Sequence, residues 1–102
     1  MNSVIHRHRQ ELTEACRQFG VERLEVFGSA ARMDFDFRKS DVDFIVRFQA
    51  PGGSGYADRY LGLAERLEQV LGTPVDLLTE RSLRNPFFVS AIAPDRTIVY
   101  AA

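Results

Sequence analysis

Two aspartates, Asp41 and Asp43, stand two residues apart in the segment SDVDFIV, which has the composition of a buried strand. Successive side chains of a strand point to opposite faces, so both carboxylates project from one face and Val42 from the other. Two neighbouring carboxylates repel each other and need a compensating cation. Their hard oxygen atoms suit Mg²⁺ or Mn²⁺, which also keep water or phosphate ligands. The pair therefore predicts a divalent-metal site.

A third acid, Asp76, lies in the segment PVDLL, where Val75 and Leu77 are expected to face the core. Neighbouring strands of a sheet are only about 4.8 Å apart, so Asp76 joins the first pair if the two strands are adjacent. Three carboxylates can hold two metal ions about 3.5–4 Å apart, which activate an attacking hydroxyl and stabilise a leaving phosphate.

A Gly28-Ser29 pair follows directly on the apolar segment LEVF, which is expected to be a strand. Glycine at a strand end lets the backbone approach a ligand closely. If a helical turn begins at Ser29 or Ala30, its free N–H groups and the serine hydroxyl can hold phosphate oxygens. Arg32 lies one turn further on and would project toward the same place. Together with the acids, this segment predicts a site for a nucleoside triphosphate.

The elements that must position these residues follow from hydrophobic periodicity and from glycine and proline stops. Ile5, Leu12, Cys16 and Phe19 recur at helical spacing ahead of Gly20. The remaining expected elements are strands at 24–27, 41–48, 75–78 and 97–100, a helix at 60–71, and a short helix within 79–93. We therefore expect an α+β fold, a small mixed β-sheet with helices packed on one side.

Composition limits the classes of protein to which the chain can belong. Its 102 residues are 45% hydrophobic and 26% charged, which is typical of a single globular domain spanning residues 1–102. A formal net charge of −1 disfavours binding to extended nucleic acid. No apolar run reaches the roughly 18–20 residues of a membrane helix, so no membrane role is expected. One cysteine, Cys16, fits a reducing cytoplasm.

The Gly-Ser pair, a polar loop and then Ser-Asp-x-Asp followed by apolar residues resemble the DNA polymerase beta-like nucleotidyltransferase superfamily. The chain length, the separate aspartate in VDLLTE and the ending NPFF…VYAA resemble the minimal nucleotidyltransferases within it. These proteins are commonly encoded beside a HEPN-domain protein as toxin–antitoxin pairs. The resemblance covers nearly the whole chain and is strongest at residues 25–46 and 74–79.

The resemblance implies a role for each matching residue. The catalytic and metal-binding residues would be Asp41, Asp43 and Asp76, and the nucleotide-binding residues would be Gly28, Ser29 and Arg32. Asp76 would also help to deprotonate the acceptor hydroxyl. The implied reaction is in-line attack of a hydroxyl on the α-phosphate with pyrophosphate leaving, catalysed mainly by positioning and charge neutralisation.

The resulting functional hypothesis is a metal-dependent transfer of AMP from ATP to a hydroxyl, a tyrosine, of a HEPN-type toxin. The cofactor would be Mg²⁺, two ions, or alternatively Mn²⁺. So short a chain has no room for a separate domain that grips the acceptor, so the partner must bring it. The protein would then act as a cytoplasmic antitoxin in a heteromeric complex.

Two departures from the pattern of the relatives support an alternative. Met33 stands where many relatives have glycine, and eleven residues, Ala30 to Ser40, make the loop between Ser29 and Asp41 longer than expected. The alternative is a non-catalytic or nucleotide-binding module that neutralises its partner by complex formation. A third hypothesis, transfer to RNA ends or to a small metabolite, is weaker because the near-neutral charge argues against RNA.

Overall fold

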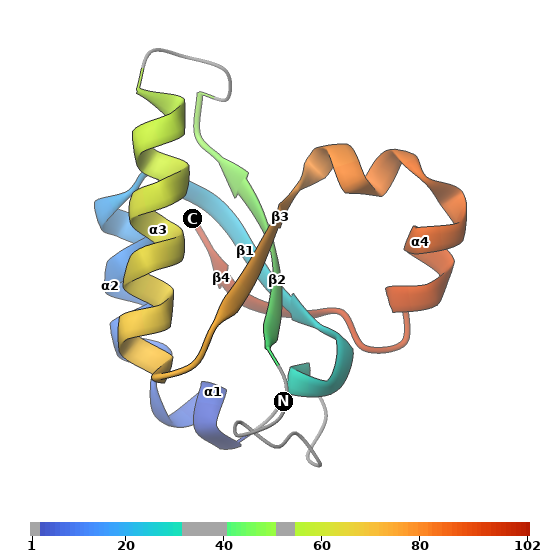
Figure 1. Ribbon diagram of the computed structural model, residues 1–102, viewed down its shortest axis with the longest axis horizontal. Coiled ribbons are helices and arrows are strands. Elements are labelled where there is room, and N and C mark those ends of the chain that lie inside the picture. The colour runs from blue at the N-terminus through green and yellow to red at the C-terminus, as the bar shows by residue number, and fades with distance from the viewer. Residues whose placement is uncertain (1–2, 32–40, 51–54) are drawn as a thin grey trace.

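The computed structural model describes residues 3–31, 41–50 and 55–102 of the chain. Its helices and strands are interspersed along the chain (Figure 1). In order, the elements are α1 (Ser3–Arg7), α2 (Arg9–Gln18), β1 (Val21–Phe27), the 3₁₀ helix η1 (Gly28–Ala31), β2 (Val42–Phe48), α3 (Tyr56–Leu71), β3 (Val75–Thr79), the 3₁₀ helix η2 (Glu80–Arg84), α4 (Pro86–Ile92) and β4 (Thr97–Ala101).

The strands form a four-stranded sheet in the described part of the chain, in the order β3-β2-β1-β4. Strand β1 pairs antiparallel with both β2 and β4, whereas β2 and β3 run parallel. The α3 helix forms the crossover that a parallel pair requires. The predicted α+β class and mixed sheet are therefore confirmed.

The main core lies between one face of the sheet and the helices α2 and α3, which lie side by side in Figure 1. Alternate residues of the central strands, Val26 and Phe44 among them, point into it and are fully buried. The helices contribute apolar stripes that include Cys16 and Leu67. The stripe predicted for the N-terminal segment is confirmed, although the segment is divided into α1 and α2. None of the described helices is long and apolar enough to cross a membrane.

A smaller cluster covers part of the other face of the sheet. Phe27 and Ile45 point away from α2 and α3, and they pack with Ile92 of α4. Phe88 contacts the ring of Phe27 edge to face, at 5.7 Å between centroids. The expectation of helices on one side therefore holds for α2 and α3 but not for α4, which lies on the opposite side in Figure 1. The physical reason is that strand alternation leaves these apolar residues on the second face, where they need cover.

Two side chains of α3 form hydrogen bonds with the backbone of β3. The Glu68 carboxylate accepts a hydrogen bond of 3.2 Å from the Val75 N–H. The Tyr60 hydroxyl donates to the carbonyl oxygen of Leu77. These bonds satisfy backbone groups on an edge strand, where unpaired groups otherwise remain available to other chains. They also hold the strand that carries Asp76.

Candidate active site

Asp43 and Asp76 lie side by side on adjacent parallel strands. They are direct partners in the register of β2 and β3, as Phe27 and Asp43 are in β1 and β2. Both aspartates belong to the face turned away from α2 and α3, because their neighbours Phe44 and Leu77 are buried in the main core. The adjacency on which the three-carboxylate hypothesis depends is therefore confirmed. Asp41 lies one residue before β2, on the same side of the alternation, and is exposed.

Asp43 is half-buried, and both its burial and its acidic neighbours disfavour the charged form of its carboxyl. Burial raises the pKa of its carboxyl above the usual value, and the negative charges of Asp76 and Asp41 raise it further. The charges of Asp76 and Asp41 are thus close enough to disfavour ionisation of Asp43. Among the described residues, no three His, Cys, Asp or Glu side chains already form a cluster arranged to hold a metal ion. The aspartates form an open acidic patch that a cation would neutralise.

Gly28 places the end of β1 directly against this patch. It begins η1 with a φ of +67°, in the left-handed region that favours glycine. A Cβ at this position would lie 2.9 Å from Oδ2 of Asp43, closer than real Cβ contacts. Only glycine therefore allows the backbone to pass this close to the carboxylate. Ser29 follows within η1 and is half-buried; the helical turn considered for this point is present as a 3₁₀ helix, and it begins at Gly28 rather than at Ser29 or Ala30.

Some of the sequence-predicted features lie outside the described residues. Arg32 and the loop that continues to Ser40, including Met33, fall in the segment 32–40. The proposed phosphate contact of Arg32 therefore stays a prediction. Of the predicted site, the structure brings together Gly28, Asp43 and Asp76, with Ser29 and Asp41 adjoining them in the chain.

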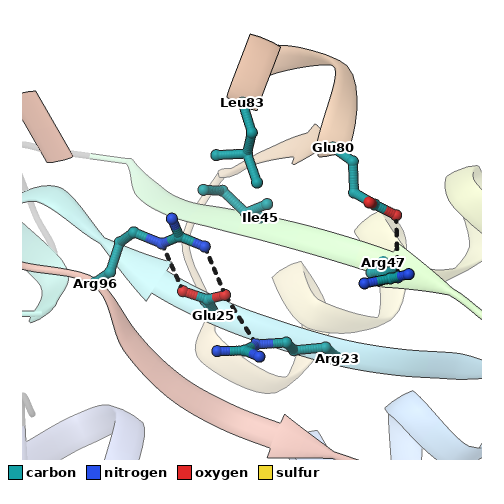
Figure 2. A pocket seen from close by; sticks show the side chains of 7 residues that line it. All are labelled: Arg23, Glu25, Ile45, Arg47, Glu80, Leu83 and Arg96. Atoms are coloured by element: carbon teal, nitrogen blue, oxygen red, sulfur yellow. Dashed lines mark hydrogen bonds and ion pairs between the residues drawn. The ribbon is translucent and has the colours of Figure 1, made fainter. Parts of the chain in front are cut away.

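A charged pocket lies on the same face of the sheet, two residues further along β1 and β2 (Figure 2). Its centre is Glu25, whose side chain is only 6% exposed. Arg96 donates two hydrogen bonds to this carboxylate, at 2.8 and 2.9 Å, and Arg23 forms an ion pair with it at 2.9 Å. The hydrogen bonds from Arg96 lower the pKa of Glu25, and the charge of Arg23 adds to this effect.

Sequence reasoning did not identify this pocket. Glu25 stands inside the apolar segment LEVF, and an acid in a buried strand was the available signal. Its partner Arg96 is 71 residues away, so no local spacing connects the two. Tyr56 and Tyr60 of α3 are partly buried and pack against the main core.

Comparison with known proteins places this arrangement in context. A family model described as "Nucleotidyltransferase domain" matches residues 9–99. The protein adenylyltransferase MntA of Thermococcus cleftensis is 33% identical over 100 residues, which cover 98% of this chain and 91% of that protein. A solved structure described as a candidate minimal nucleotidyltransferase superposes with a TM-score of 0.73 at 28% identity and covers 95% of both chains.

A third comparison shows the same fold in a larger assembly. The solved structure of a tri-AMPylated Shewanella oneidensis HEPN toxin in complex with an MNT antitoxin matches with a TM-score of 0.63. Identity is 16%, and the match covers 96% of this chain and 73% of that one. At this identity the likeness is one of fold.

Proposed function

This chain belongs to the nucleotidyltransferase domain family and is a minimal nucleotidyltransferase. We propose that it transfers AMP from ATP to a tyrosine hydroxyl of a HEPN-type toxin. In this proposal the protein is a cytoplasmic antitoxin that forms a heteromeric complex with the toxin. The main observation behind this proposal is that the register of β2 and β3 sets Asp43 beside Asp76, while Gly28 lies against the Asp43 carboxylate. The adenylyltransferase relative supports the reaction, and the complex of HEPN toxin with MNT antitoxin supports the partner.

The donor set fits hard divalent cations. Asp41, Asp43 and Asp76 would supply carboxylate oxygens to Mg²⁺, two ions, or to Mn²⁺. The pKa of Asp43 is raised first by burial and then by the charges of Asp76 and Asp41, and a bound cation would offset both effects. Divalent ions bound there would neutralise phosphate charge and make the acceptor hydroxyl easier to deprotonate.

The chain's own residues have separate tasks in this proposal. Backbone N–H groups at Gly28 and Ser29 would hold the triphosphate beyond the end of β1, and Arg32 would contact a phosphate. Asp76 would accept the proton of the acceptor hydroxyl. The hydroxyl oxygen bonds to the α-phosphorus, the bond from that phosphorus to pyrophosphate breaks, and the proton passes through Asp76 to solvent. Pre-arranged groups of this kind lower the barrier mainly by positioning and electrostatics.

A transfer assay with one substitution tests the proposal. The protein is incubated with a lysate of its own source, Mg²⁺ and ATP labelled at the α-phosphate, beside the Asp43→Asn variant. A matched control, Asp58→Asn, makes the same chemical change at an exposed position of α3. We expect one labelled protein band with the wild type and the control and none with Asp43→Asn, and mass spectrometry then identifies the acceptor.

The Asp43→Asn variant is expected to fold, because a neutral amide of the same size avoids both the burial cost and the repulsion that raise the pKa of the aspartate. Circular dichroism and urea unfolding check this point. A labelled band of full strength with Asp43→Asn would refute the catalytic role of the carboxylates. A partner captured without any label, from wild type and variant alike, would favour the non-catalytic module instead.

A further inference from the structure

The charged pocket around Glu25 lies along β1 and β2 on the side of Asp43 away from Gly28. We propose that this pocket, walled by Arg23, Arg47 and Arg96, binds an anionic group carried by the acceptor next to the hydroxyl that is adenylylated. This inference rests on the proposed function. The anionic group is a carboxylate or a phosphate, since guanidinium groups hold the oxygens of both.

Its place on the sheet follows from strand register. Phe27 pairs with Asp43, and two residues further along the same strands Glu25 pairs with Ile45. With a rise of about 3.3 Å per residue, the centre of the pocket lies roughly 7 Å along the strands from Asp43. That distance is within the length of one extended amino-acid side chain or one nucleotide unit.

The direction of the reaction distinguishes acceptor from leaving group. The triphosphate is assigned to Gly28 and Ser29, beyond the end of β1. Attacking and leaving oxygens lie roughly in line through the phosphorus, so the acceptor hydroxyl must approach from the side opposite pyrophosphate. Glu25 precedes Phe27 in β1, so the pocket lies on the side of Asp43 away from Gly28, where we place the acceptor.

The part of the pocket around Glu25 carries one surplus positive charge, whereas Arg47 is matched by Glu22 and Glu80. Glu25 is buried, but two guanidinium groups share its single negative charge. Arg96 uses two of its five N–H donors on the carboxylate, and the ion pair of Arg23 uses its Nε. The Arg23 side chain is 46% exposed, so its outer donors reach solvent. The Glu25 carboxylate thus holds the guanidinium groups of Arg23 and Arg96 side by side, so their remaining N–H donors are oriented before a ligand binds.

The remaining lining adds a third cation, Arg47, a second acid, Glu80, and two apolar side chains. Arg47 forms exposed ion pairs of 3.4 Å with Glu22 and 3.3 Å with Glu80, and such pairs are weak enough to be exchanged for a ligand. Ile45 and Leu83 supply the apolar floor of a cavity of about 140 Å³ (Figure 2). This space suits one side-chain-sized group.

Two sources share this anionic chemistry. One is an acidic side chain of the acceptor polypeptide near its hydroxyl. The other is the phosphodiester left by a first transfer, whose ribose still carries hydroxyl groups that can accept a second AMP. The two sources differ in which transfer they assist, so product counting separates them.

The test uses the double variant Arg23→Gln/Arg47→Gln, which leaves the buried Glu25–Arg96 pair intact. Its matched control is Arg17→Gln, an exposed arginine on α2 at the other side of the sheet. Binding of the probe O-phosphotyrosine is measured first by calorimetry with EDTA present, so that the aspartates cannot hold phosphate through a metal. We expect the double variant to bind about 10–100-fold more weakly than wild type, from about 1.5–3 kcal/mol per charged hydrogen bond. The control is expected to bind like wild type.

The second measurement counts AMP groups on the acceptor by intact mass. A first addition slowed at least tenfold identifies an acidic side chain as the source, and a normal first addition with later additions lost identifies the phosphodiester. Unchanged probe binding, or equal weakening by Arg17→Gln, overturns the proposal. If the wild type transfers nothing, the proposed function fails, and probe binding alone still decides whether the pocket is an anion site.

Discussion

Replacement of Gly28 by alanine tests the closest approach in the candidate site. An alanine Cβ would lie 2.9 Å from Oδ2 of Asp43, whereas ordinary contact begins at 3.4 Å. The carboxylate must therefore move by about half an ångström, as overpacked side chains do. A misplacement of about 1 Å can cost 100-fold in rate, so we expect transfer to fall by about 10–100-fold.

Gly72 provides a matched control because it has nearly the same backbone conformation without the neighbour. Its φ is +69°, against +67° at Gly28, and a Cβ there would meet nothing within 4 Å. Alanine in this conformation costs about 1–2 kcal/mol, partly offset by about 0.4–1 kcal/mol from a less flexible unfolded chain. Gly72→Ala should thus lower stability by about 1 kcal/mol, or a melting temperature by roughly 4–8 °C, with normal transfer.

Gly28→Ala should carry this backbone cost plus about 1–2 kcal/mol from crowding of Asp43. Urea unfolding of both variants measures the difference, and the α-phosphate label measures transfer. In a double-mutant cycle, Asp43→Ala should remove the extra cost, because the crowded carboxylate is gone. The reasoning is refuted if Gly28→Ala is no less stable than Gly72→Ala and transfers AMP at the wild-type rate.

Two further predictions concern groups outside the acidic patch. Because the pKa of Glu25 is lowered in the folded state, its pairing stabilises the fold above the ordinary glutamate pKa of about 4.3, and this stability is lost as pH falls through the lowered value. Arg96→Leu should therefore cost about 3 kcal/mol in urea unfolding at neutral pH, and a penalty that does not shrink in acid would contradict the pairing. Burial raises the pKa of the Cys16 thiol to about 12, so iodoacetamide should label the native protein far more slowly than the urea-unfolded protein at pH 8. Equal labelling rates would show that the thiol is accessible.

The sequence alone could predict an acidic site beside a glycine turn, because both features depend on local residue spacing. Alternation in a strand puts Asp41 and Asp43 on one face, and Gly28 follows an apolar strand whatever the rest of the chain does. The same periodicity identified the core face of β2 and the stripes of the helices. The roles of Arg32 and of the metal ligands stay predictions, since they concern groups that bind there.

Tertiary structure decided the contacts between segments that are distant in the chain. The parallel register of β2 and β3 sets Asp76 beside Asp43 rather than one residue away, where it would have faced the core. Helix α4 packs on the second face of the sheet, where Phe88 removes the apolar ring of Phe27 from water. The Glu25–Arg96 pair spans 71 residues, and no periodicity relates its members. Local sequence determines which face a side chain occupies, but only the packed sheet determines which neighbour it meets there.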